Sequence, residues 1–183
     1  VGLGAQVAIV NDMSEQQAYL QAGANAAGAV VIDAADDVTV DAAANRDHRV
    51  RGAGITAGAV AAGAAIGEIS VTGQTGAEIG SFAKIGEDNN GTNTVNSLSV
   101  SAISTDTLAA DMFAVAAGIG AGAGNGATIT YRASTYANLA AGVVLELRGS
   151  VAVTAESTPK VSTEMFGVAA GGLAAFEGEL RNL

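Results

Sequence analysis

Apolar residues occupy every second position in several short runs of this chain. The runs at residues 30–34, 38–41 and 151–155 show this period-2 pattern. Successive side chains of a β-strand point to opposite faces, so alternation of this kind gives the strand one buried face and one exposed face. Gly, Asn, Asp and Ser bound the runs, as is typical of strand ends. The pattern therefore predicts many short β-strands.

Alanine and glycine complicate this interpretation, because the chain contains 41 Ala and 25 Gly among 183 residues. Alanine is the best helix former, so helix is the alternative for the Ala-rich stretches. Here alanine is mixed with glycine and β-branched residues, and no stretch keeps the i, i+3, i+4, i+7 apolar stripe of an amphipathic helix. We predict strands with little helix.

The chain repeats itself. When the sequence is shifted against itself, residues 98–102 fall on 151–155 and, at the same shift, residues 112–118 fall on 165–171. A second row joins Leu20, Ile79 and Leu139, which follow one another at nearly equal intervals. These intervals indicate three copies of a unit of roughly 60 residues, a long period of the kind that marks repeat architectures. The copies would lie at 1–62, 63–122 and 123–183.

A third, weaker alignment places Ile32 at the position of Val100. Short strands that repeat at a fixed long period predict a solenoid or a blade array. Propeller blades usually carry aromatic motifs, whereas this chain has 4 Phe, 3 Tyr and no Trp.

We therefore predict an all-β fold, a parallel β-helix (right-handed β-solenoid), in a single segment that spans residues 1–183. Each repeat unit would divide into about three coils of roughly 20 residues, a common length for structural repeats. The narrow interior of such a solenoid suits aliphatic side chains. The predicted inward positions are Ile32, Val40, Val71, Ile79, Val100, Leu108, Ile129, Leu139, Val153 and Val161.

Charge and composition exclude several classes of function. The 18 acidic and 8 basic residues give a formal charge of −10, which disfavours nucleic acid and anionic membranes as partners. The absence of cysteine excludes disulfides and cysteine-ligated metals. Residues 112–131 carry no charge, but five of them are glycines, so we expect no membrane insertion.

Two apparent insertions supply the candidate binding residues, because insertions in solenoids become surface loops. The first spans Asn45–Arg51 and concentrates basic side chains, which could pair with an acidic neighbour or with an anionic glycan. Its candidate residues are Arg46, His48, Arg49 and Arg51. The alternative is a solvated charge cluster, and the lone histidine makes a metal site improbable.

The second apparent insertion spans residues 86–94, and its candidate binding residues are Asp88, Asn89 and Asn90. Glu87 and Asp88 offer the oxygen ligands that calcium takes, although the segment matches neither the EF-hand loop nor the Gly-Gly-x-Gly-x-Asp repeat. We expect no cofactor, with calcium at this segment as the alternative.

Evidence for catalysis is weak. Asp33, Asp36, Asp37 and Asp41 form an acidic cluster of the kind that polysaccharide-active enzymes place on one face. The repeat does not reproduce these carboxylates, and no nucleotide-binding, serine-hydrolase or zinc-protease motif is present. We therefore expect that the protein is not an enzyme.

Several motifs resemble a known class of exoproteins. These are residues 1–11, Leu98–Ala102, Gly149–Ala155 and Gly167–Gly171. They are similar to stretches of the filamentous-haemagglutinin-like and leukotoxin-like repetitive adhesins, which bacteria export by type V secretion routes. The resemblance covers nearly the whole chain, but its motifs are compositional. It implies a right-handed parallel β-helix, a cell-surface or secreted location and an adhesive role, and it carries no catalytic residues.

The resulting expectation is a structural or adhesive segment of a secreted bacterial surface or matrix protein, part of a longer repetitive chain. Its partners would be neighbouring coils, further copies of itself, or a glycan or protein of a cell surface. The alternatives are a filament subunit that stacks end to end, an ice-binding protein, and a β-helical enzyme acting on polysaccharides.

Overall fold

The protein consists almost entirely of strands, with one short 3₁₀ helix at Ala26–Gly28 among the described residues. The computed structural model describes the chain except for residues 22, 29, 34, 87–94 and 183. The strands are β1 (Gly2–Asp12), β2 (Glu15–Leu20), β3 (Val31–Ile32), β4 (Ala35–Ala57), β5 (Val60–Val71), β6 (Gln74–Ile79), β7 (Lys84–Ile85), β8 (Val95–Ala117), β9 (Gly120–Tyr131), β10 (Ser134–Leu139), β11 (Val144–Leu145), β12 (Val151–Ala170) and β13 (Leu173–Asn182).

These strands stack into four parallel sheets. The β1 sheet has the order β1-β5-β9-β13, the β2 sheet β2-β6-β10, the β3 sheet β3-β7-β11 and the β4 sheet β4-β8-β12. Each sheet receives one strand from every passage of the chain, which is the arrangement of a parallel β-solenoid. The all-β solenoid predicted from the sequence is therefore confirmed, as is the predominance of strand over helix.

The coil is much longer than predicted. Val40 of β4 pairs with Val100 of β8, so the chain returns to the same place in the stack only after one whole repeat unit. Val100 pairs in turn with Val153 of β12, so the next passage is slightly shorter. The repeat unit is thus a single coil and not three short ones. The cause is strand length: β4 and β8 each run for 23 residues, far beyond the short runs that alternate visibly in the sequence.

The strand register confirms two of the three sequence alignments. Leu20, Ile79 and Leu139 are paired neighbours in the β2 sheet, and Met112 pairs with Met165 in the β4 sheet. The weaker alignment is wrong, because Ile32 pairs with Ile85 and not with Val100.

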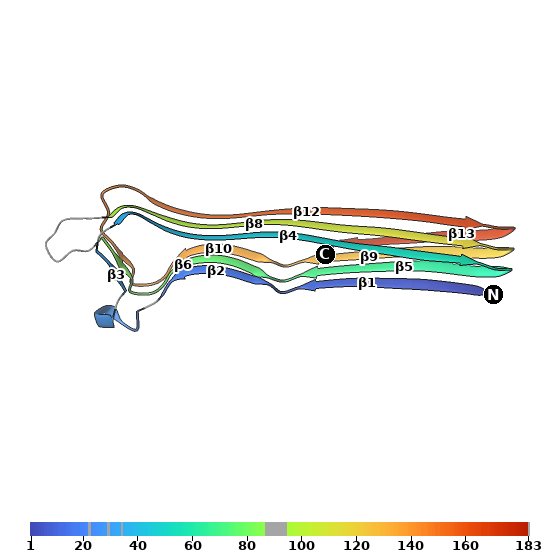
Figure 1. Cartoon of the computed structure of the whole chain (residues 1–183), viewed down its shortest axis with the longest axis horizontal. Helices are drawn as coiled ribbons and strands as arrows, with labels where there is room; N and C mark the ends of the chain where they lie inside the picture. Colours follow the sequence, from blue (N-terminus) through green and yellow to red (C-terminus); the bar gives the residue numbers. More distant parts are fainter. Residues whose placement is uncertain (22, 29, 34, 87–94, 183) are drawn as a thin grey trace.

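Each coil has a wide end and a narrow end (Figure 1). At the wide end the β2, β3 and β4 sheets diverge and enclose an aliphatic core. At the narrow end the β1 and β4 sheets face each other directly, and tight turns join them at residues 58–59, 118–119 and 171–172. Large buried side chains of the wide end are Ile79, Ile85, Val95, Leu98 and Val100, and buried alanines of the narrow end are Ala61, Ala114, Ala116, Ala121 and Ala123.

The burial of the predicted inward residues depends on which coil of the stack they belong to. Val71, Ile79, Val100, Leu108 and Ile129 are fully buried. Ile32, Val40 and Leu139 are half-buried and pack against the core.

Val153 and Val161 are different, with 45% and 41% of their surface exposed. They pair with Val100 and Leu108 and so share the inward-facing register. Their strand, β12, lies at the edge of the β4 sheet, and no further described coil covers them.

Candidate functional site

The basic segment Asn45–Arg51 is not a loop but the middle of β4. The weaker alignment, which sets Ile32 against Val100, also sets Val40 against Leu108 and so creates the apparent insertion. In the structure the residue that pairs with Leu108 is His48. With the correct register β4 and β8 match without an insertion at this segment. The loop interpretation is therefore wrong. Alternation along the strand directs Arg46 and His48 inward and Arg49 and Arg51 outward.

The Arg46 side chain lies in the interior and is only 6% exposed. Its Nη1 forms an ion pair of 3.1 Å with Asp106 Oδ1, and Asp106 is fully buried. A buried guanidinium needs a partner for each of its donors, because unpaired buried charge is very costly. The remaining acceptors are Ser14 Oγ, Ser104 Oγ and Thr75 Oγ1 at 3.1 Å, the Gln74 carbonyl at 3.2 Å and the Ser14 carbonyl at 3.4 Å.

Asp106 is held as a carboxylate by its neighbours. Burial alone would raise the pKa of Asp106, but hydrogen bonds from Ser104, Tyr131 and Arg46 outweigh it and lower the pKa. Ser104 Oγ and Tyr131 OH donate to Asp106 Oδ2 at 2.6 and 2.7 Å. Desolvation also raises the pKa of the Tyr131 phenol.

A second carboxylate, Asp12, completes this cluster. His48 Nε2 lies 2.8 Å from Asp12 Oδ2, and Arg46 Nε lies 3.6 Å from the same oxygen. Burial would raise the pKa of Asp12, yet the Ser14 backbone and side-chain contacts and His48 together lower it. The polar waist, as we name this cluster, separates the wide end from the narrow end, and it consists of Asp12, Ser14, Arg46, His48, Thr75, Ser104, Asp106 and Tyr131.

The polar waist is closed by its own contacts, which identifies it as a structural element of the interior. Sequence reasoning missed the acidic partners of Arg46. The signal was available, because Arg46 and Asp106 lie one repeat unit apart and are direct partners in the parallel register.

Arg49 and Arg51 lie on the outer face of the β4 sheet. Both approach one carboxylate, with Nε atoms 3.6 and 3.2 Å from Asp111 Oδ2. Of the four predicted basic residues, only these two are exposed to a ligand. Whether they bind one stays a prediction.

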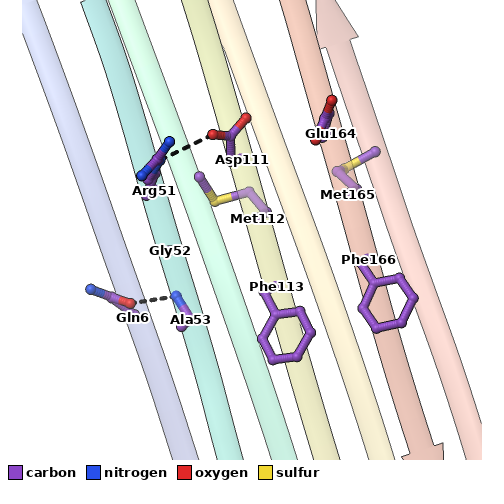
Figure 2. A pocket seen from close by; sticks show the side chains of 10 residues that line it. All are labelled: Gln6, Arg51, Gly52, Ala53, Asp111, Met112, Phe113, Glu164, Met165 and Phe166. Atoms are coloured by element: carbon purple, nitrogen blue, oxygen red, sulfur yellow. Dashed lines mark hydrogen bonds and ion pairs between the residues drawn. The ribbon is translucent and has the colours of Figure 1, made fainter.

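A groove of about 710 Å³ crosses this outer face (Figure 2). One row along it is charged and comprises Arg51, Asp111 and Glu164, each from the next strand of the sheet. The second row lies two residues further along each strand, which is about 7 Å away, and comprises Ala53, Phe113 and Phe166. The intervening Gly52, Met112 and Met165 also line the groove, and Gln6 of β1 lies at one end.

The two phenylalanines make the second row unusual. Their ring planes differ by 5° and their centroids are 5.5 Å apart. Phe113 is 36% exposed and Phe166 58% exposed, and Figure 2 looks onto the faces of both rings. The sequence repeat aligns these two residues, since both follow the methionine that opens the matching motifs at 112–118 and 165–171. Only the fold shows that both rings point outward.

The remaining predicted residues give no site. Glu87, Asp88, Asn89 and Asn90 lie outside the described residues, so the calcium alternative stays a prediction. Among the described residues no three His, Cys, Asp or Glu side chains gather as a metal site would require.

One member of the acidic cluster at residues 33–41, Asp37, accepts hydrogen bonds from the Ser97 hydroxyl and the Asn96 amide on the neighbouring strand β8, and these bonds lower its pKa. Asp37 is thus held as a carboxylate by contacts between strands.

Comparison with known proteins identifies no relative. No family model, no curated protein and no solved structure matches this chain. The described part of the chain also contains no helix long and apolar enough to cross a membrane. The resemblance to repetitive adhesins is thus supported at the level of the β-solenoid architecture, and the family itself is not identified.

Proposed function

We propose that this chain is a structural and adhesive segment of a secreted bacterial surface or extracellular matrix protein. The observation that supports the proposal is the parallel register of the long stacked strands, in which each coil is a template for the next. Such stacking makes a stiff support. The groove on the outer face of the β4 sheet is the surface that this support would present to a ligand.

The proportions of the coil refine this proposal. A strand of 23 residues is about 75 Å long, whereas each added coil extends the stack by only about 4.8 Å. The described coils therefore form a flat slab that is longer along its strands than along its stacking axis. A rod would need many such coils, as in the long repetitive chain that the proposal envisages.

A second candidate is a filament subunit whose ends stack on further copies. It is favoured by Val153 and Val161, which face inward yet stay partly exposed at the edge of the stack. Unpaired edge strands are templates for pairing with another chain.

Two features weaken edge-to-edge pairing. At one edge, the Gln6 side chain accepts the Ala53 N–H of β4, which occupies a donor that an added strand would use.

At the other edge lies Pro159, which is inside β12. The Leu98 N–H donates to the Ser150 carbonyl, and the Gly118 N–H donates to the Ala170 carbonyl. The backbone N–H and C=O groups of even-numbered residues in β12 therefore point toward β8, and those of odd-numbered residues point toward the open edge. Pro159 is odd-numbered, and its missing N–H therefore faces the open edge, where proline is tolerated. These features favour the adhesive segment over unassisted polymerisation.

Immunolabelling of the producing cells tests the proposal. Antibodies against the chain should label intact cells or the surrounding matrix as strongly as permeabilised cells. Labelling that requires permeabilisation would contradict a surface or matrix role. Size-exclusion chromatography of the purified chain addresses the alternative, since concentration-dependent growth of the particles would favour the filament subunit.

A further inference from the structure

We propose that the groove on the outer face of the β4 sheet binds an extended, uncharged polysaccharide whose chain runs along the solenoid axis. This inference rests on the proposed adhesive function and names the ligand class of its groove. Four features carry it: the aromatic row, the charged row without excess positive charge, the paired backbone beneath them, and the repeat along the axis.

The aromatic row matches the apolar face of a sugar. Phe113 and Phe166 lie nearly parallel and turn their ring faces toward the groove. The axial C–H groups of a pyranose ring form a flat apolar surface with partial positive charge, which packs on the negative face of an aromatic ring. Two such rings on adjacent strands offer neighbouring platforms. An ordinary apolar side chain would fill the space without this planarity.

The opposite row matches the hydroxyl rim. Arg51 offers N–H donors, and Asp111 and Glu164 offer carboxylate acceptors. Glu164 forms no hydrogen bond or ion pair with other described residues, so its carboxylate can accept from hydroxyl groups. A groove with one apolar wall and a few convergent polar groups is typical of a specific binding site.

The charge balance favours an uncharged ligand. Arg49 and Arg51 share Asp111 at 3.6 and 3.2 Å, and Glu164 adds a second carboxylate on the next strand. With Arg49, which lies beside the groove lining, the formal charges of these four side chains cancel, and the charged row alone carries one net negative charge, so the groove offers no excess of positive charge. A sulfated or carboxylated glycan would need cations without carboxylate partners. The inward-facing cation of the same segment, Arg46, is already buried against Asp106.

The sheet beneath the groove disfavours a peptide. β4, β8 and β12 are paired along the whole floor, so the backbone between them has its ladder hydrogen bonds. Extended peptides usually bind sheets by adding a strand at an edge, where donors and acceptors are unpaired. A polysaccharide needs no backbone partner and binds through side chains.

The direction of the groove suits a polymer. Its rows cross β4, β8 and β12 in turn, so each step along a row advances about 4.8 Å. That advance is close to the length of one sugar residue in an extended chain. Successive coils can therefore contact successive sugar residues.

Affinity electrophoresis of the full chain tests the inference, in native gels that contain mixed-linkage β-glucan, xylan, galactomannan, dextran sulfate or gelatin. The test variant is the double substitution F113L/F166L, which keeps apolar volume but removes the flat rings. The control is Ile103→Ala, because Ile103 is an exposed residue of the same face of β8 that does not line the groove. Circular dichroism and the melting temperature confirm that each variant folds.

At least one neutral polysaccharide should retard the native chain and the I103A variant equally, and high salt should not abolish the effect. The double variant should bind about tenfold more weakly, the size expected for losing aromatic packing. If the double variant fails to fold, Glu164→Gln replaces it and should weaken binding by losing the charged acceptor.

Three outcomes would overturn the inference: no retardation by any neutral polysaccharide, equal retardation of the double variant, or retardation by dextran sulfate or gelatin alone. None of these would affect immunolabelling at the cell surface, so the failure of the ligand assignment is distinguishable from failure of the proposed function.

Discussion

The wide and narrow ends of each coil reach a packed interior in different ways. At the wide end, Ile79, Ile85 and Leu98 fill a core between three sheets. The narrow end begins with a second aliphatic cluster that includes Ile69, Leu108 and Ile129. Only toward the tight turns are the buried residues alanines, and there glycines allow the backbones of two sheets to approach directly. A Cβ added at Gly54 of β4 would lie 2.2 Å from the Ala64 carbonyl oxygen of β5.

This difference shows that one repeat can combine two packing regimes. Large side chains hold sheets apart and bury much apolar area, whereas small residues bury less area per residue but permit close backbone contact. The polar waist lies where the β1 sheet gives way to the β2 sheet, between the wide-end core and the second aliphatic cluster. The change to alanine packing comes further along, toward the tight turns. Substitutions in the polar waist and in each regime should separate their contributions to stability, from the largest expected effect to the smallest.

Removal of the cation from the polar waist should have the largest effect. Arg46→Met leaves Asp106 fully buried without its ion pair, so the free energy of unfolding should fall by about 3–5 kcal/mol. Urea denaturation monitored by circular dichroism measures this loss. Addition of Asp106→Leu to the same chain should recover part of it, since the uncompensated charge is then gone. A loss below about 1 kcal/mol in the single variant would show that water enters the cluster.

Truncation of the wide-end core should come next. Ile79 is fully buried in the middle coil, and Ile79→Ala should lower the free energy of unfolding by about 2–5 kcal/mol through lost burial and a residual cavity. Val153→Ala is the control on an edge strand, where the side chain is 45% exposed and the loss should be much smaller. Equal losses at the two sites would mean that further chains cover the edge in solution.

Overpacking of the narrow end should cost somewhat less. Gly54→Val places a Cβ against the Ala64 carbonyl, a backbone atom that can move only if the sheets separate, and about 1–3 kcal/mol of stability should be lost. Gly126→Val is the control, because nothing lies within 4 Å of a Cβ added there. Thermal melts of the two variants should therefore diverge. A Gly126→Val variant as unstable as Gly54→Val would show that the close contact between the β1 and β4 sheets at Gly54 is not the cause of the loss.

Acidification should produce the mildest change at first. The folded-state pKa values of Asp12 and Asp106 lie below the ordinary value of 3.8. A lowered pKa contributes stability that is present above the unfolded pKa and is lost as the pH falls through the folded pKa.

The melting temperature should thus be insensitive to these two groups above about pH 5 and should fall below about pH 4. The fall should be shallower in the Arg46→Met/Asp106→Leu chain. An equally steep fall in that chain would assign the acid sensitivity to other carboxylates.

The sequence by itself determined the class of the fold, because period-2 alternation and motifs that recur at a long, nearly constant interval permit few structures other than a solenoid. It also identified Val100, Leu108 and Ile79 as inward residues, since their neighbours along the strand are polar or small. Where Ala and Gly dominate, alternation does not distinguish inward from outward positions. Both residues fit either face of a strand, so the sequence pattern did not predict that β4 and β8 continue for 23 residues.

Tertiary structure alone decided which side chains meet. Parallel pairing joins residues a full coil apart, such as Arg46 with Asp106 and Phe113 with Phe166, and local alternation carries no information on that distance. Aligning Val40 with Leu108, in the place that belongs to His48, was enough to turn an interior strand into an apparent surface loop. The polar waist and the groove both arise from this long-range register, and neither exists in any single stretch of the chain.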